Sequence, residues 1–446
     1  MTVKNLPESP VYLGYHYGNK TFLLDTAYLD EKGKGAFTGE EKLTGGIYFI
    51  AFPSMNYVDF IINDLQNFSV ETDTIDFLKT LNISNSLENA LFIDYQIKMS
   101  ALRNRQSELI AHMNMNTHIP DSVVRIRKEL DKLTAAMNSY KKDMVKSNPN
   151  TLFGKIIDAF TEPEVPEPDY EKLFANGGDR DSIIQMYMFN WYKNHYFDNY
   201  DFSDNRLLRT SILPARLKGY FSGVVYQDAD SMTSEAHRII GLSMANDEVY
   251  RFTLSYIFSF FEMNGEIPVE KAFVSLAEKY YLSGKTPWLS EEFLKQLRTR
   301  VECIKPNMTG VKAPDMLLYD LENRKLSLHS LNDEFILLYF YDIECGHCKE
   351  LTPLVHDLAK KYDNRVRFLA IYDEIDFEGW KKFISDNNLT DWTNLCDADS
   401  STGMVRLYDI YKTPRIFLLD HNKTIIAKDM EVEQLESYLD YIISNQ

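Results

Sequence analysis

The sequence predicts a multidomain α+β protein with an N-terminal antiparallel β domain, a helical middle and a C-terminal α/β fold. Residues 11–75 contain short aromatic and β-branched runs separated by glycine-bearing turns, which is typical of strands. From about Ser84, apolar residues recur three and four positions apart, as on one face of a helix. After Pro306, strand-like and helix-like runs alternate, which favours a mixed, partly parallel sheet covered by helices.

These changes of pattern divide the chain into four domains and one linker. The predicted segments are a β-rich domain over 1–80, a helical hairpin over 81–160, a Pro/acid linker over 161–169, a helical domain over 170–305 and an α/β domain over 306–446. The linker assignment rests on prolines, which suppress helix, and on acids, which keep the segment solvated.

The predicted hairpin depends on an apolar stripe that runs from Val123 to Met144 at helical spacing. The stripe also fits the seam of a coiled-coil dimer. Three to four heptads are near the minimum for a coiled coil, so we favour a hairpin within one chain. The aromatic stretch from Met186 to Phe202 is interpreted in the same way, as a packed helical core in preference to a ligand cleft.

The C-terminal segment can be assigned element by element, because its apolar runs are short and separated by polar turns. We expect strands at 316–319, 326–330, 335–341, 366–372, 414–420 and 424–428 and helices at 346–361, 377–388 and 432–444.

Composition excludes several partners. The formal net charge is −18, and an acidic chain of this kind repels the phosphate backbone of nucleic acids. There is no basic cluster for anionic lipid and no apolar run near the ~18–20 residues that cross a bilayer. The start at Met1 lacks the apolar segment of a secretory signal. Two interpretations follow: a cytosolic protein, or an exported protein whose signal was removed.

The main chemical signal is a pair of cysteines in the motif Cys345-Gly346-His347-Cys348, since the chain has only four cysteines. The apolar run 335–341 leads directly into the motif and a helical pattern follows, which puts Cys345 at a helix N-terminus. Unpaired N–H groups and the helix dipole favour a thiolate there. The second thiol, one turn further along, can resolve the mixed disulfide that the first one forms.

His347 bears on the direction of the redox reaction. An imidazole that is protonated or donates a hydrogen bond stabilises the thiolate of Cys345, and a stabilised reduced form makes the disulfide a stronger oxidant. Gly346 and His347 are therefore assigned as active-site support. The pair is itself the redox centre, so no dissociable cofactor is expected.

Two structural explanations compete with a redox role for the pair. A Cys-x-x-Cys can be half of a zinc site, but zinc needs two more ligands at compatible spacing. Cys303 and Cys396 are single and distant, so we predict no metal and treat them as free thiols with packing roles. A Cys303–Cys396 bridge stays open. A purely structural Cys345–Cys348 disulfide is disfavoured by the strand–motif–helix setting.

The segment from Phe335 to Pro353 resembles the active-site segment of the thioredoxin superfamily, with Pro353 at the helix-kinking proline. The segment from Tyr411 to Asp420 is similar to the cis-proline strand of that family. The resemblance implies a thioredoxin-like fold, a cis bond before Pro414, and contact of Thr413 and Pro414 with the substrate chain. An X-Pro cis bond there leaves neighbouring backbone groups free for an extended peptide.

The long span between Cys345 and Pro414 and the lead-in 310–318 resemble the TlpA/ResA-like branch of the superfamily. Residues 11–75 and 170–300 resemble accessory domains of unknown function that precede such modules in Bacteroidota envelope proteins. Those relatives are exported, often as lipoproteins. The resemblance therefore implies a periplasmic or envelope location, with peripheral or lipid-anchored membrane association, and favours a removed signal over the cytoplasm.

The chain departs from the family pattern at three places. Tyr339 stands where thioredoxin has a buried aspartate that accepts a proton, and Tyr341 and Glu344 replace two tryptophans. Glu344 opposes a thiolate at its neighbour by like charge. A peroxidase is disfavoured, because the peroxiredoxin pattern Pro-x-x-x-Thr-x-x-Cys meets Leu338 and Asp342 instead.

The prediction is a thiol:disulfide oxidoreductase that exchanges disulfides with envelope protein substrates through Cys345 and Cys348. The reductive direction is slightly favoured, with an upstream envelope reductase that resets the pair. Two alternatives remain: a partner-binding scaffold with a redox-regulated thioredoxin module, and a disulfide isomerase. The oligomeric state and the role of residues 1–305 are open.

Overall fold

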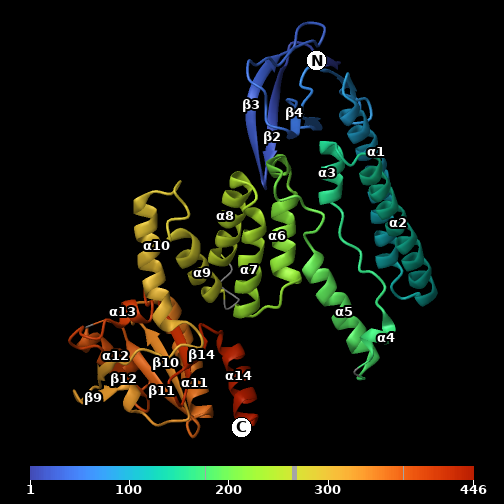
Figure 1. The fold of residues 1–446 in the computed structure, drawn as a ribbon. Helices are drawn as coiled ribbons and strands as arrows, with labels where there is room; N and C mark the ends of the chain where they lie inside the picture. Colours follow the sequence, from blue (N-terminus) through green and yellow to red (C-terminus); the bar gives the residue numbers. More distant parts are fainter. Residues whose placement is uncertain (176, 264–268, 375, 446) are drawn as a thin grey trace. The chain divides into compact units, whose positions relative to one another are not determined.

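A computed structural model describes all residues except 176, 264–268, 375 and 446 (Figure 1). The chain divides into two compact units. The first comprises Met1–Gln227 and Ser234–Phe260, and the second comprises Asp228–Thr233 and Phe261–Gln446. The predicted fold class is confirmed: mainly antiparallel strands come first, with β1 and β6 as the parallel pair, helices follow, and a mixed sheet covered by helices ends the chain. The boundaries of the five predicted segments stay a prediction.

The first unit begins with two sheets. A four-stranded antiparallel sheet has the order β3-β2-β4-β5, and a three-stranded sheet has the order β1-β6-β7. The strands are β1 (Thr2–Lys4), β2 (Pro10–Tyr17), β3 (Lys20–Tyr28), β4 (Gly46–Ala51), β5 (Tyr57–Ile62), β6 (Ser69–Asp73) and β7 (Asn82–Ser84). Apolar side chains from both sheets, such as Leu13, Phe60 and Val70, form one core. Along the strands of the four-stranded sheet, every second residue points into this core and the residues between point to the opposite face, because successive side chains of a strand alternate.

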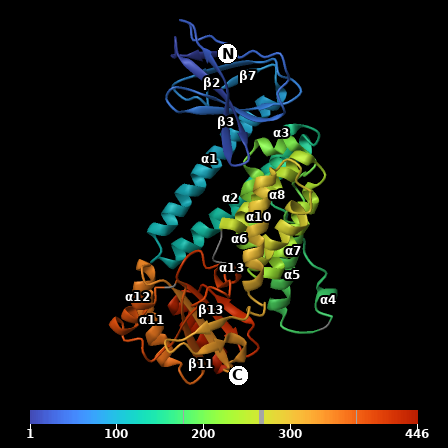
Figure 2. The same cartoon turned by 90° about the vertical axis from the view of Figure 1, so that its left-hand side faces the viewer.

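Helices complete the first unit. They are α1 (Leu87–Met115), α2 (Pro120–Ser147), α3 (Leu152–Ala159), α4 (Tyr170–Leu173), α5 (Arg180–His195), α6 (Ile212–Gly223), and most of α7 (Ala229–Ser243) and α8 (Asp247–Met263), with a 3-10 turn η1 (Asn205–Arg209). α1 and α2 lie side by side (Figure 2), and the rings of Tyr95 and Tyr140 stack with their centroids 5.9 Å apart. Tyr140 of the α2 stripe thus packs against α1 of the same chain.

The second unit has a seven-stranded mixed sheet with the order β14-β13-β10-β11-β12-β8-β9. β10 lies inside it, parallel to β11 and antiparallel to β13. The strands are β8 (Leu317–Tyr319), β9 (Lys325–Ser327), β10 (Phe335–Tyr341), β11 (Val366–Tyr372), β12 (Thr393–Cys396), β13 (Arg415–Asp420) and β14 (Ile425–Lys428). All seven residues of β10 are buried, because both faces of the sheet are covered.

The helices of this sheet are α11 (Gly346–Lys361), α12 (Phe377–Asp386), α13 (Met404–Leu407) and α14 (Val432–Ser444). α9 (Glu270–Leu276), a π-helical turn η2 (Ala277–Tyr281), α10 (Glu291–Ile304) and a 3-10 turn η3 (Lys305–Asn307) precede it. One face of β10 packs against α11, α12 and α14, and the other packs against Met404 and Tyr408.

The sequence-based prediction is wrong at 328–330. There the chain leaves the sheet in a 3-10 turn, η4 (Leu328–Ser330), and Leu328 points into the core. No helix in the described part of the chain is long and apolar enough to cross a membrane.

Candidate active site

The site begins where β10 ends. The strand passes through Asp342–Glu344 into α11, and Cys345 is the N-cap residue of that helix. Its φ of −69° and ψ of 119° are extended, and its sulfur accepts a hydrogen bond from the backbone N–H of Cys348 at 3.3 Å. The thiol therefore takes the place that a Ser or Asp oxygen takes at many helix N-termini, where unpaired N–H groups favour negative charge.

The two thiols differ in exposure. Cys345 is partly exposed, whereas the side chain of Cys348 is completely buried in the first turn of α11. A polar group lies beneath Cys348: the Thr352 hydroxyl donates to the Cys348 carbonyl at 2.7 Å and lies 2.9 Å from the Tyr339 hydroxyl. This arrangement exposes one sulfur for attack and holds the second behind it.

The loop before β13 closes the other side of the site. The Thr413–Pro414 peptide bond is cis, which confirms the geometry expected for Pro414. The Cys345 thiol donates a hydrogen bond to the Thr413 carbonyl at 3.4 Å. Two segments nearly seventy residues apart in sequence thus meet at one sulfur, as the resemblance implied. Whether Thr413 and Pro414 bind substrate stays a prediction.

Electrostatics separate the two thiols further. Burial by itself raises the pKa of Cys345, but interactions with the Cys348 thiol and backbone N–H, with the Thr413 side chain and with the His347 backbone N–H outweigh it. The net pKa of Cys345 lies below its ordinary value. Burial raises the pKa of Cys348 to about 12, and the neighbouring Cys345 sulfur contributes to that increase. Of the two thiols, Cys345 is therefore the more readily ionised, and Cys348 holds its proton more tightly.

The supporting residues predicted around the pair occupy different positions. Gly346 is the first residue of α11, and Pro353 lies within α11 on its exposed side. The imidazole of His347 is 84% exposed and lies 3.8 Å from the Glu350 carboxylate. His347 contributes to Cys345 through its backbone N–H, so the expected stabilisation comes from the main chain and not from the imidazole.

The two tyrosines that depart from the family pattern are both in the core. Burial raises the pKa of Tyr339 and of Tyr341, so neither phenol is a proton acceptor near neutral pH. The Tyr341 hydroxyl accepts a hydrogen bond from the Trp380 indole N–H at 2.8 Å. Both tyrosines are therefore protonated core residues whose hydroxyls are hydrogen-bonded, Tyr339 with Thr352 and Tyr341 with Trp380.

Sequence reasoning missed one titrating group at this edge of the sheet. Tyr341 and Tyr372 are register partners, so Asp342 and Asp373 leave β10 and β11 next to each other. The Asp373 Oδ1 atom is buried and has no hydrogen-bond partner among the described residues. Burial, followed by the charge of Asp342, raises the pKa of Asp373 to about 7. Its position directly after a buried strand was the available signal.

The remaining two cysteines are free thiols with different neighbours. The Cys303 sulfur lies 3.8 Å from the Tyr411 hydroxyl, and the Cys396 thiol donates to the Tyr319 carbonyl at 3.7 Å. Burial raises the pKa of Cys396 to about 11. Across the described residues, no three His, Cys, Asp or Glu side chains are arranged to hold a metal ion.

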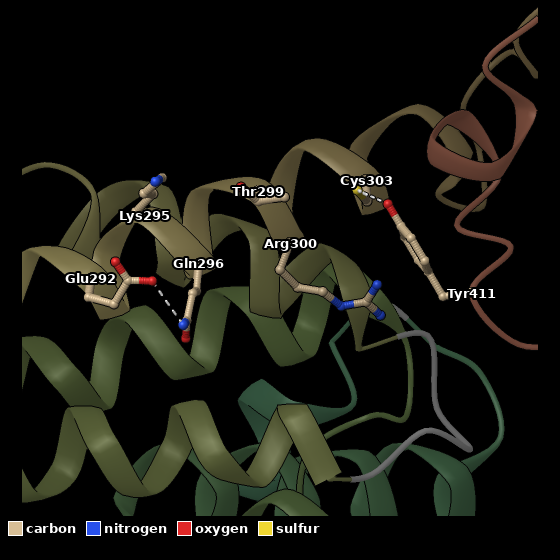
Figure 3. Close-up of a pocket in the computed structure, with 7 residues that line it drawn as sticks. All are labelled: Glu292, Lys295, Gln296, Thr299, Arg300, Cys303 and Tyr411. Atoms are coloured by element: carbon tan, nitrogen blue, oxygen red, sulfur yellow. Dashed lines mark hydrogen bonds between the residues drawn. The ribbon is translucent and has the colours of Figure 1, made fainter.

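A shallow cavity of about 350 Å³ lies along α10 close to the Thr413 loop (Figure 3). Side chains from one face of α10 line it, and Tyr411 lies at its Cys303 end. The Arg300 guanidinium forms an ion pair with Asp409, and Asp409 also accepts from Arg415. These pairs attach α10 to the segment that carries Thr413.

Comparison with known proteins agrees with this geometry. The family described as thioredoxin-like matches residues 332–425, and a domain of unknown function, DUF5106, matches residues 185–307. The C-terminal region is thus a thioredoxin-like domain, and the chain is an oxidoreductase of that class.

Individual relatives indicate a more specific class than the family match does. Thiol-disulfide oxidoreductase ResA of Bacillus cereus is 27% identical over 137 residues, which cover 30% of this chain and 78% of ResA. ResA of Geobacillus thermodenitrificans is 28% identical over 137 residues, 77% of its length. The C-terminal region is homologous to these ResA-type thiol-disulfide oxidoreductases.

Two solved structures are also similar. A thioredoxin-like protein from Bacteroides caccae is 21% identical with a TM-score of 0.47, and the alignment covers 63% of this chain and 98% of that one. A domain of a possible thiol-disulfide isomerase from Cytophaga hutchinsonii is 33% identical with a TM-score of 0.30, and it covers 31% of this chain and 96% of that one.

Proposed function

We propose that the chain is an envelope thiol:disulfide oxidoreductase whose reaction centre is the Cys345–Cys348 pair and whose substrates are protein disulfides. One observation carries the proposal. The half-exposed Cys345 sulfur accepts an N–H at the start of α11, while Cys348 lies buried directly behind it. The names of the ResA relatives agree with this chemistry.

In the reductive direction, the Cys345 thiolate attacks one sulfur of a substrate disulfide. A mixed disulfide forms, and the first substrate sulfur leaves as a thiolate that takes a proton from solvent. Cys348 then loses its proton and attacks the Cys345 sulfur, which releases the second substrate thiolate. The substrate gains two electrons, and the protein is left with a Cys345–Cys348 disulfide. A dithiol reductase of the envelope supplies two electrons to reset the pair.

No dissociable cofactor is needed for this cycle, because the pair carries both electrons. We expect the Thr413 carbonyl, which accepts from the Cys345 thiol, to pair with the backbone of a substrate beside its cysteine. The same geometry supports the oxidising direction when the pair starts as a disulfide, and the reductive direction remains slightly favoured.

Reduction of insulin by dithiothreitol tests the proposal. We expect the full chain to accelerate precipitation of the insulin B chain and Cys345→Ser to abolish the acceleration, because no other thiol in the described part of the chain occupies a helix N-cap with a lowered pKa. Cys303→Ser is the matched control, since it removes a buried thiol from the same unit and should leave the rate unchanged.

A trapping experiment identifies the substrate. In Cys348→Ala the resolving thiol is missing, so mixed disulfides through Cys345 should accumulate and can be identified by mass spectrometry. Equal insulin rates for wild type and Cys345→Ser, together with no trapped species, would contradict the proposal and favour a scaffold.

A further inference from the structure

The β3 edge of the N-terminal sheet is unusually exposed. β3 ends the four-stranded sheet and pairs only with β2 among the described strands, so one row of its backbone N–H and C=O groups has no ladder partner there. Eight of its nine residues are exposed. Leu23 and Tyr28 are 63% and 75% exposed. Proteins usually shorten, charge or cover such an edge, because it can pair with another strand.

A cavity lined by both apolar and polar side chains reaches this edge. It has a volume of about 760 Å³, and its floor consists of buried side chains on the core face of the sheet, including Leu13, Ile50 and Phe60. Leu24 of β3 and Phe37 of the following loop also line it. The cavity therefore extends along the core face of the four-stranded sheet, from β3 at one edge to β5 at the other. A volume of this size is typical of a ligand site.

A β-bulge links the edge to the cavity. The β2–β3 register shifts between Leu13 and Gly14, so that Leu24 is the extra residue of β3 beside the pair Leu13–Asp25. A bulge of this kind re-aims a side chain and bends an edge strand. A strand added along the free edge of β3 would therefore direct every second side chain toward the cavity.

The charged side chains at the cavity are all carboxylates, and the one positive group in its described lining, the Met1 ammonium, donates to the Gly35 carbonyl at 2.7 Å. Three carboxylates line it, those of Asp25, Glu40 and Glu41, and no Lys or Arg side chain contributes to its described lining. None of the three forms an ion pair within the described part of the chain. The site therefore favours a cationic neighbour next to an apolar group.

We propose that the β3 edge and its cavity bind an extended segment of the disulfide-bearing polypeptide substrate. The segment adds a strand to β3 and inserts a bulky apolar side chain, flanked by Lys or Arg, into the cavity. Main-chain hydrogen bonds supply affinity and the pocket supplies specificity, as in other forms of strand addition. The inference rests on the proposed function, since it names the substrate class as polypeptides with accessible, unfolded segments.

The charges argue against two other occupants. Pairing of β3 with β3 of a second copy brings two sets of the same carboxylates together, and an anionic lipid surface is repelled by them. A second copy of the chain is thus an outcome of the test and not the proposal.

The test uses fluorescein-labelled insulin B chain with both cysteines carboxamidomethylated, so that binding is separated from thiol exchange. In fluorescence anisotropy we expect saturable binding to the full chain and at least tenfold weaker binding to Leu24→Glu, which places a carboxylate at the cavity mouth. Thr21→Glu is the matched control, because Thr21 is an exposed β3 residue outside the cavity lining, and it should weaken binding less than threefold. Amide exchange should show protection of β3 when the peptide is bound, which tests the site without any substitution.

Equal binding by Leu24→Glu and Thr21→Glu, or a bound peptide that leaves β3 unprotected, would overturn the inference. A dimer in sedimentation that Leu24→Glu dissociates would replace the polypeptide by a second copy. Reduction of the small disulfide 5,5′-dithiobis(2-nitrobenzoic acid) separates the two claims. Its rate should be the same in wild type and Leu24→Glu, and no turnover of it at all would refute the proposed function and not the binding site.

Discussion

β10 and β3 are the two strands that matter most in this molecule, and they are built in opposite ways. β10 pairs on both sides, with β11 and β13, and all of its residues are buried. β3 pairs on one side, and only Ala27 of its nine residues is buried. β10, which leads into Cys345, has neighbouring strands on both sides to pair with its backbone. β3 has a row of backbone groups with no strand partner among the described residues, and its apolar side chains are exposed. Thiol exchange requires the Cys345 sulfur to be held in a fixed position, which a buried strand provides. Binding of an added strand requires backbone groups that have no partner yet, which an edge strand provides.

The largest structural effect predicted from this comparison is on stability. Leu337→Ala in β10 removes a side chain with no solvent exposure and should destabilise the second unit by about 2–5 kcal/mol, because it leaves a cavity in the core. Leu23→Ala in β3 is the matched substitution and should change stability by less than about 0.5 kcal/mol. Calorimetry of the full chain measures both. A similar loss for the two variants would mean that β3 is covered in solution.

A smaller effect concerns Asp373, at the edge of the sheet that β10 and β11 share. Its folded pKa of about 7 lies above the ordinary value of 3.8. The folded state therefore binds the proton more tightly, and the stability that this group contributes is lost as pH rises from 3.8 through about 7. Asp373→Asn removes the buried charge, so it should raise the melting temperature clearly at pH 8 and only slightly at pH 4. A stabilisation that is equal at both pH values would show that Asp373 is not protonated in the acidic sample.

Much of the C-terminal fold could be predicted, because its strands are continuous apolar runs. The range 335–341 coincides with β10 and the range 346–361 with α11. β12 escaped notice because its four residues, Thr-Asn-Leu-Cys, have no strand pattern and are held by their parallel pairing with β11. β7, with three residues, is shorter still and is held by its antiparallel pairing with β6. Tertiary pairing decides such segments, and sequence alone does not show it.

The parts of the site that depend on neighbouring residues in the sequence could be predicted. A strand that runs into Cys-x-x-Cys places the first thiol at a helix N-terminus, and the structure has it there as the N-cap residue. The position of the His347 imidazole was not predictable, because a flexible exposed side chain selects its partner from nearby charges, here Glu350. The pKa of Asp373 depends on burial between two strands, which no sequence motif reports. The catalytic and substrate-binding roles of Cys345, Cys348, Thr413 and Pro414 stay predictions.

The difference between the two thiols is the central claim, and pH-dependent alkylation measures it directly. Reduced full-length protein is treated with iodoacetamide from about pH 5 to about pH 10, a range that brackets the ordinary thiol pKa, and the labelling rate of each cysteine is followed by mass spectrometry. Cys345 should label with a midpoint below the ordinary thiol value of 9.0, and Cys348, with its pKa raised to about 12, should label at least about a thousandfold more slowly at pH 7. Equal rates for the two thiols, or faster labelling of Cys348, would contradict the account.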